Sequence, residues 1–467
     1  MRGEFSLSRK PIPWEFWRRA KEGEYCKTKD FEMKRFYPTL KEKIREHDVK
    51  YNPEAPLLPT DDLIRDMYKA AMELLFEVGI LCTDTERVIK FEKDEIDKNL
   101  RLLPEEIVLG SGDDKITVHA RGVEDRRPPV IEGGPIGGPL SEELHEIAAK
   151  VYEAYAREPL VDRQSCHGYG KTFKGMPVEG RSPVELECDG AIVQSAVEGI
   201  RRAGRPGMPL CGSTAVSLEG YMSAQWPNGT SLHAYIMPNM KTDYNTLCRA
   251  LHCMNRGYHV WGGGQAAIGG LAGPPEGCAI TTVAENIAGY LLYNYVEGSV
   301  WVIDALHPGT TSRKSIWVNC VAMAALARHV RLICRGIPYI TYAGPCTEMA
   351  FHEIAASTIG GTVVGNNPNV GTGKGGVGDD LFAPLHSRFQ AQVAQASLKL
   401  KREDASVLMD TILKKYELVL NDRKEPTGKK FQECYNLKTL TPSKELIEIY
   451  VNVIKDLQNL GLPVVAF

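Results

Sequence analysis

The sequence has almost no excess charge, because 56 Lys and Arg stand against 59 Asp and Glu over 467 residues. Such a chain lacks the strongly basic surface that nucleic acids and anionic membranes favour, so neither is expected as a partner. It also has no run of 18 apolar residues, and residues 1–20 mix charges, proline and tryptophan without the apolar centre of a secretion signal. We therefore expect a cytoplasmic protein without a membrane anchor.

The 12 cysteines never form a C-x-x-C pair. Cys166-His167 and His252-Cys253 do not repeat at a spacing that lets neighbouring side chains share one metal ion, so no metal is predicted. Reduced thiols buried in a core are the expectation for most of these residues. With 43% apolar and 25% charged residues, the composition is that of an ordinary globular protein, which excludes disorder as the main state.

From about residue 136, short apolar runs alternate with helical patterns. The predicted strands are Leu160–Ser165, Met208–Gly212, Tyr258–Gly262, Ser299–Asp304, Pro338–Ala343 and Thr362–Gly365. The predicted helices between them are Ser141–Arg157, Pro183–Ala203, Lys241–Asn255, Cys278–Val296, Lys314–Ile333 and Glu348–Ser357. Strict alternation indicates parallel βαβ units and favours an α/β fold, a closed (β/α)₈ TIM barrel, over an open doubly wound sheet.

We expect residues 136–380 to form the barrel core. Residues 1–135 are predicted to be an N-terminal extension packed on it, with an amphipathic helix at Thr60–Val78 that Thr60 caps. Residues 381–467 are predicted to be helical elements that complete the same domain.

Barrel chemistry lies at the carboxyl ends of the strands, which directs attention to Cys211 in Gly207–Gly212. A buried structural thiol and an exposed reactive thiol are both compatible with this position. In the run Tyr258–Gln265, the period of two puts His259 and Trp261 on one face, as core residues or beside an open space. The predicted strands contain no lysine, so a Schiff-base aldolase is disfavoured.

Several blocks in order along nearly the whole chain resemble the monomethylamine:corrinoid methyltransferases. These blocks are Leu81–Thr85, Lys93–Ile96, Val108–Gly112, Gly133–Pro135, Ala203–Met208, Ala343–Met349, Phe431–Tyr435, Lys438-Thr439 and Thr441-Pro442. The resemblance implies a TIM-barrel enzyme, assembled as a homo-oligomer, that transfers a methyl group from an amine. The acceptor is the Co(I) corrinoid (cobalamin) of a separate corrinoid protein, so no tightly bound cofactor is expected.

The family carries pyrrolysine after its Gly-Met segment, and Cys211 holds that place here. By the same resemblance, the family's Glu, Gln and Tyr beside pyrrolysine fall at Gly263, Pro338 and Ile340. A thiol cannot act as the electrophile that the pyrrolysine imine provides. We expect Cys211 as the catalytic contact. The substrate-binding candidates are His259, Trp261, Gln265, Tyr342 and Glu348.

The leading hypothesis is a corrinoid-protein-dependent methyltransferase with a small N-methyl donor, such as a quaternary amine, which needs no electrophilic handle. In one alternative, monomethylamine is the donor and Cys211, with a zinc ion, replaces pyrrolysine. Another alternative is a non-catalytic paralogue that retains corrinoid-protein docking.

Overall fold

The computed structural model describes residues 13–212, 217–223, 231–264 and 266–466. Its centre is an eight-stranded sheet in which every pair of neighbouring strands is parallel. In chain order the strands are β6 (Glu132–Gly133), β7 (Arg163–Ser165), β10 (Leu210–Cys211), β11 (Ser231–His233), β13 (His259–Gly263), β15 (Glu297–Ser299), β17 (Ile333–Arg335) and β18 (Asn366–Asn367).

The last strand returns to the first. The amide of Glu132 in β6 donates to the carbonyl of Pro368, 3.2 Å away, and Glu132 forms a parallel bridge with Asn369 just beyond β18. The predicted (β/α)₈ barrel is therefore confirmed. Its first strand, β6, lies just before residue 136, the predicted start of the barrel core.

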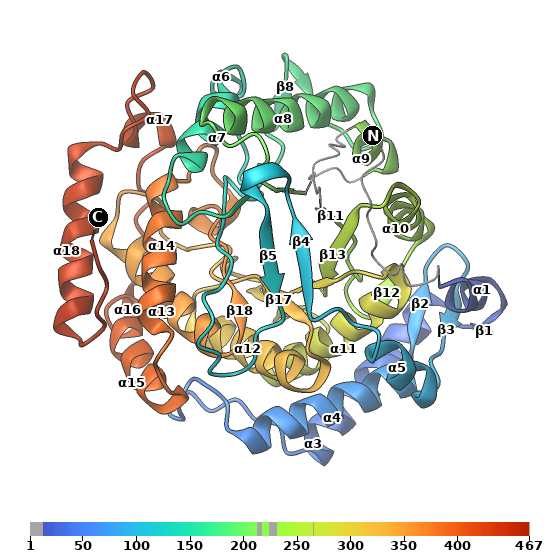
Figure 1. Cartoon of the computed structure of the whole chain (residues 1–467). Helices are drawn as coiled ribbons and strands as arrows, with labels where there is room; N and C mark the ends of the chain where they lie inside the picture. The colour runs from blue at the N-terminus through green and yellow to red at the C-terminus, as the bar shows by residue number, and fades with distance from the viewer. Residues whose placement is uncertain (1–12, 213–216, 224–230, 265, 467) are drawn as a thin grey trace.

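A helix follows each strand and covers the outside of the barrel (Figure 1). These helices are α7 (Ala148–Ala156) after β6, and then α8 (Pro183–Arg202), α9 (Leu218–Ser223), α10 (Tyr244–Arg256), α11 (Pro275–Tyr293), α12 (Arg313–Ala325), α13 (Glu348–Val363) and α14 (Pro384–Ser397). Short elements decorate their loops: α6 (Glu142–His145), the hairpin β8 (Thr172–Phe173) and β9 (Met176–Pro177), the pair β14 (Ala267–Ile268) and β16 (Ile303–Asp304), and the helical turns Leu326–Val330 and Lys374–Gly376.

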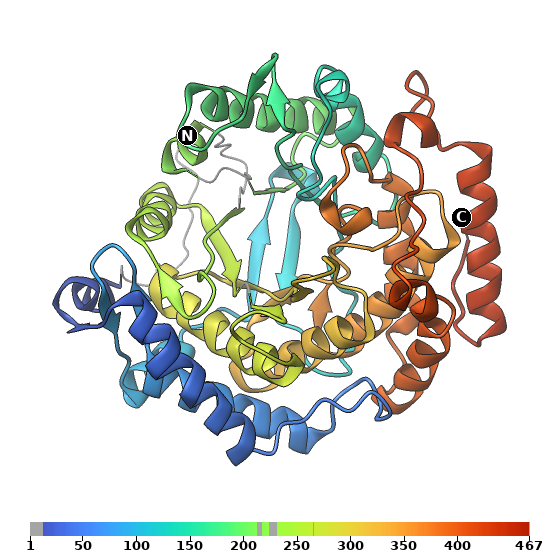
Figure 2. The ribbon, with the colours of Figure 1, turned by 180° about the vertical axis from the view of Figure 1, so that it is seen from behind.

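The N-terminal extension wraps around the barrel helices (Figure 2). Helix α4 (Asp61–Val78) begins where predicted, because the Thr60 hydroxyl accepts a hydrogen bond from the Leu63 amide. It packs on α11 and α12, which are consequently buried on both faces. The extension also contains α1 (Trp14–Glu22), α2 (Thr28–Asp30), the π-helix Phe31–Phe36, α3 (Tyr37–Glu46), α5 (Lys93–Leu100), the 3₁₀ turn Gly112–Asp114 and the strands β1 (Glu24–Tyr25), β2 (Ile80–Cys82) and β3 (Arg87–Ile89). These strands form one sheet with β12 (Lys241–Thr242), which comes from the barrel and pairs with β2.

A β-hairpin formed by β4 (Glu106–Leu109) and β5 (Ile116–His119) closes one end of the barrel. Its buried Ile107, Leu109 and Val118 pack against Ile333, the first residue of β17. The hairpin therefore covers the amino-terminal ends of the strands, and it crosses the barrel in front in Figure 1. The opposite face, which carries the carboxyl ends of the strands, is the one seen in Figure 2.

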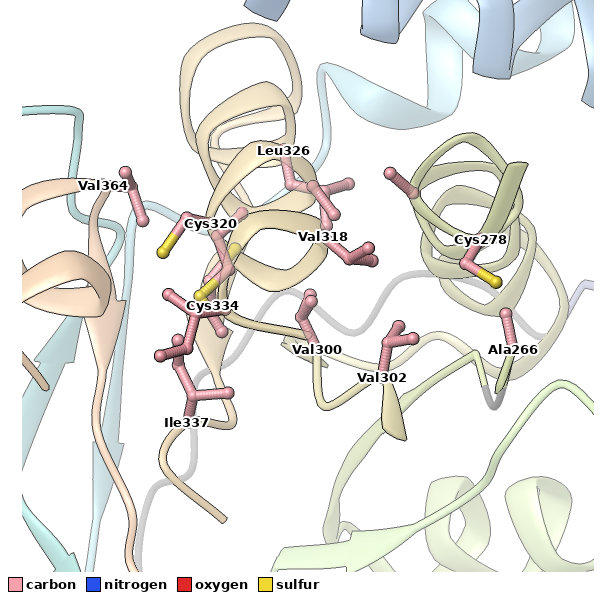
Figure 3. Close-up of a cluster of buried hydrophobic side chains, with 14 of the residues drawn as sticks. Ala266, Cys278, Val300, Val302, Val318, Cys320, Leu326, Cys334, Ile337 and Val364 are labelled. Atoms are coloured by element: carbon pink, nitrogen blue, oxygen red, sulfur yellow. The ribbon is translucent and has the colours of Figure 1, made fainter. Parts of the chain in front are cut away.

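Between the sheet and the helices lies an apolar layer that contains several of the cysteines. Figure 3 shows Cys278 of α11, Cys320 of α12 and Cys334 of β17 among valine, leucine and isoleucine side chains. All 12 cysteines are free, ten are buried, and Cys248 is exposed. The ten buried cysteines fill the interior as small apolar side chains.

The predicted strand Ser299–Asp304 is shifted, because the barrel strand β15 ends at Ser299 and β16 belongs to a separate pair. Two further strand predictions are wrong. Pro338–Ala343 is not a strand, because β17 lies earlier, at Ile333–Arg335, directly after Arg331 ends the preceding helical turn in a left-handed conformation. Thr362–Gly365 contains the end of α13, and β18 is the polar pair Asn366-Asn367. Residues 381–467, predicted to be helical, contain α14, α15 (Arg402–Leu413), α16 (Glu417–Asn421), α17 (Phe431–Cys434) and α18 (Lys444–Asn459).

No helix within the described part of the chain combines the length and apolar character needed to cross a membrane.

Candidate active site at the carboxyl ends of the strands

The interior of the barrel holds four charged side chains that are completely buried. Glu132 and Glu297 lie on either side of Arg163, with N–O distances of 3.0 and 2.8 Å. Arg335 makes an ion pair with the other oxygen of Glu132, and Ser165 donates to the same oxygen. We call these four residues, Glu132, Arg163, Glu297 and Arg335, the interior ion cluster. Its two cations and two anions balance, so the cluster carries no net charge.

Cys211 ends β10, where its backbone pairs with Ser165 of β7 and Ser231 of β11. Burial raises the pKa of its thiol to about 12, although the nearby Arg163 guanidinium opposes this shift. The residue is therefore a neutral thiol at neutral pH. It is a poor nucleophile and metal ligand in this state, because both roles need the thiolate.

Trp261 of β13 lies beside Cys211 and the interior ion cluster. A Cβ atom placed on Gly212, the residue after Cys211, would lie 3.5 Å from the Trp261 ring. The Arg335 guanidinium stacks on this ring, 4.0 Å from its centroid. Trp261 is thus held in place by a cation–π contact at the level of the cluster.

Three half-buried rings continue from Trp261 toward the carboxyl ends of the strands. Tyr235 lies 5.5 Å from Trp261 and 6.1 Å from Trp301, and Trp301 lies 5.2 Å from Tyr339, measured between ring centroids. We call Tyr235, Trp261, Trp301 and Tyr339 the aromatic group. Trp261 lies within β13, whereas Tyr235, Trp301 and Tyr339 follow the carboxyl ends of β11, β15 and β17.

His259 lies at the other end of β13 from Gly263. It precedes Trp261 by two residues, about 6.6 Å along the strand. Its ring is close to the backbone of Val108 in the closing hairpin, and burial lowers its pKa below the usual value. The period of two correctly put His259 and Trp261 on one face, but His259 lies on the closed side of the barrel.

The remaining predicted site residues are not grouped with Cys211. The Tyr342 ring contacts the His307 ring in a tilted arrangement, with 4.5 Å between the centroids, and its hydroxyl donates to the Gly309 carbonyl. Glu348 is exposed in the first turn of α13. Gln265 lies outside the described residues.

A groove of about 1340 Å³ opens at the outer rim, away from Cys211. Its lining includes Tyr342, His307, Arg313 and Arg402, where the N-terminal extension meets α15 and α16. Because its walls are helices and loops outside the barrel interior, we assign the chemistry to the Cys211 region and not to this groove.

Sequence reasoning missed the interior ion cluster and three members of the aromatic group. A usable signal exists for Tyr235 and Trp301, since each follows the last residue of a strand by two positions and therefore continues its inward face. Within the described ranges, no group of three or more His, Cys, Asp or Glu side chains is arranged to hold a metal ion.

Fold and site together define a (β/α)₈-barrel enzyme with its site at the carboxyl ends of the strands. The sequence pattern of the family "Monomethylamine methyltransferase MtmB" matches residues 13–462. The chain belongs to this family and is therefore a methyltransferase.

Individual relatives agree with this assignment. Monomethylamine methyltransferase MtmB1 of Methanosarcina barkeri is 31% identical over 460 residues, which cover 96% of this chain and 98% of the relative. MtmB of Methanosarcina mazei is 30% identical over 461 residues, with the same coverage. The crystal structure of the Methanosarcina barkeri enzyme superposes with a TM-score of 0.90 at 29% identity, over 98% of this chain and 100% of that chain.

Proposed function

We propose that this chain transfers a methyl group from a small donor with a quaternary N-methyl nitrogen to the Co(I) corrinoid of a separate corrinoid protein. The observation that carries the proposal is the aromatic group beside Cys211. Aromatic faces attract quaternary ammonium ions through the ring quadrupole, and such ions are recognised by cages of several rings.

The residues at the pyrrolysine position and around it support this donor class. By its resemblance to the family, the chain has Cys211 where pyrrolysine stands, and Gly263, Pro338 and Ile340 where Glu, Gln and Tyr stand. A buried thiol with a pKa of about 12 offers neither an electrophile nor a thiolate. The donor must then already be activated for methyl transfer.

A quaternary nitrogen meets this requirement. When its methyl group leaves, the C–N bond breaks, the electron pair stays on nitrogen and a neutral tertiary amine departs. The Co(I) corrinoid supplies the electron pair that accepts the methyl group. The task of this chain is to hold the methyl group at the open end of the barrel and to exclude water there.

Only one end of the barrel is open, and this agrees with an acceptor that a separate protein brings to that end. The hairpin β4–β5 blocks the amino-terminal end, whereas the half-buried Tyr235, Trp301 and Tyr339 lie toward the carboxyl ends of the strands. A corrinoid protein would dock on this second face. Homo-oligomeric assembly stays a prediction, which sedimentation of the purified protein tests.

The test is methyl transfer to a cognate corrinoid protein held as Co(I), followed by its absorbance. The donors are tetramethylammonium, trimethylglycine, N-methylglycine, dimethylamine and monomethylamine. Methylation by a quaternary donor but not by monomethylamine is expected. Absence of methyl transfer from every donor would refute the proposal and favour the non-catalytic paralogue.

Cys211→Ala tests the contact role of the thiol, with Cys334→Ala as the matched control. Both residues are buried on barrel strands, but Cys334 lies in the apolar layer of Figure 3. We expect Cys211→Ala to slow transfer about tenfold, a positioning effect worth about 1.4 kcal/mol, and Cys334→Ala to leave the rate unchanged. Equal effects of the two substitutions would remove Cys211 from the site.

Monomethylamine remains the second candidate donor, because the relatives are named for it. In this alternative, Cys211 and a zinc ion take over the function of pyrrolysine. Transfer from monomethylamine together with one zinc per chain would select it, and metal-free protein that is active with a quaternary donor would exclude it.

A further inference from the structure

The buried interior of the barrel contains several hydrogen-bond donors that lack an acceptor. Among the described residues, five polar atoms near Cys211 are buried with neither a hydrogen bond nor an ion pair. They are Nε and Nη1 of Arg335, Nη2 of Arg163, Nε1 of Trp261 and Oγ of Ser231. Unpaired buried donors are unfavourable, and folded proteins retain them mainly where a ligand or water completes them.

Arg335 also limits what the aromatic group can bind. Its guanidinium occupies one face of Trp261, and only Nη2 contacts a carboxylate, that of Glu132. The interior ion cluster is already neutral, so a purely cationic donor would bring an uncompensated positive charge next to Arg335. The rings of Tyr235, Trp301 and Tyr339 remain available to a cation, but at the cost of this repulsion.

A donor that carries a carboxylate as well as the ammonium group avoids the repulsion from Arg335. A carboxylate supplies two acceptors to Arg335, and arginine binds carboxylates in this way with strong directional hydrogen bonds. The methylated ammonium group of the same molecule then lies toward Tyr235, Trp301 and Tyr339, on the open side of the barrel. The net charge of the interior does not change.

We infer that this enzyme selects a zwitterionic donor, an N-methylated amino acid of the betaine type, and that Arg335 binds the carboxylate of this donor. This inference rests on the proposed function for the transfer step, but not for binding. Arg335 is completely buried beneath the aromatic group. The carboxylate therefore enters from the open end, and the half-buried rings move to admit it.

The experiment is calorimetric binding to the purified full chain without corrinoid protein. The probes are trimethylglycine, its methyl ester, choline and tetramethylammonium, which share the quaternary nitrogen and differ in the carboxylate. Trimethylglycine is expected to bind about 10- to 100-fold more tightly than the other probes, the range of one charge-assisted carboxylate contact. Equal affinities, or no binding of trimethylglycine, would overturn the inference.

Two arginine variants separate recognition from folding. Arg335→Lys keeps the charge beside Glu132 but loses the planar guanidinium, so it should remove the preference for trimethylglycine over choline. Arg121→Lys is the control, because Arg121 is equally buried but donates to backbone carbonyls near β18. An unchanged preference in Arg335→Lys would refute the role of Arg335.

Methyl transfer distinguishes failure of this inference from failure of the proposed function. Transfer from tetramethylammonium or choline but not from trimethylglycine would retain the proposed function and reject the zwitterion. Tight binding of trimethylglycine without transfer from any donor would retain the carboxylate site and reject the proposed function.

Discussion

Glu132 is the residue whose removal should disturb the barrel interior most. It is completely buried at the edge where β6 meets β18, and its carboxylate contacts Arg163, Arg335 and Ser165. In Glu132→Gln, Arg163 keeps Glu297, but Arg335 loses its carboxylate partner. Breaking a buried ion pair in this way costs about 3–5 kcal/mol, because one charge is left uncompensated.

The expected shift of the melting temperature follows from the size of the chain. An unfolding entropy of about 2.1 cal/mol/K per residue gives about 1 kcal/mol/K for 467 residues. Glu132→Gln should therefore lower the calorimetric Tm by about 3–5 °C. The additional substitution Arg335→Met should recover part of this loss, since it removes the unpaired charge.

Glu124→Gln is the matched control for this prediction. Glu124 also has two cationic partners, Lys401 and Arg402, but its side chain is 20% exposed. A partly exposed pair contributes about 0–1 kcal/mol, so the control should melt within about 1 °C of the wild type. Equal Tm values for wild type and Glu132→Gln, or no recovery in the double variant, would refute the reasoning.

Three further predictions concern protonation, thiol reactivity and a helix cap. Burial raises the pKa of Glu353 to about 8 from 4.5, so the folded state holds a proton that the unfolded state releases, and this contribution to stability falls as the pH rises toward 8. Urea unfolding should show a loss of about 2–3 kcal/mol between pH 6 and 8.5 that is absent in Glu353→Gln. Iodoacetamide at pH 7.5 should modify the exposed Cys248 and leave Cys211 unmodified, as peptide mass spectrometry will show. Thr60→Ala should cost about 0.5–2 kcal/mol in urea unfolding, because the Leu63 amide loses its cap.

The long helices and the barrel class could be predicted because their signals are local. The helix at Asp61–Val78 has its cap and its apolar period in the sequence itself, and Pro183–Arg202 likewise begins where Ser182 caps it. The alternation of strands and helices then restricts the topology to a few parallel folds. Family motifs spread along the chain gave the same assignment.

The strands β6 and β18 escaped prediction for a physical reason. Each has two residues, and Glu132-Gly133 and Asn366-Asn367 lack the apolar alternation of a half-buried strand. The barrel interior is polar here, so these strands carry charged or amide side chains on the inward face. In contrast, Pro338–Ala343 has the composition of a strand without forming one.

The site shows the same division between local and distant information. The sequence by itself determined that Cys211 ends a barrel strand and that Trp261 shares a strand face with His259. Only the tertiary structure decided that Arg335 stacks on Trp261, that Tyr235, Trp301 and Tyr339 lie next to one another, and that His259 faces the closing hairpin. These contacts join strands far apart in the chain, and strand order, register and closure of the barrel fix them, which no local pattern encodes.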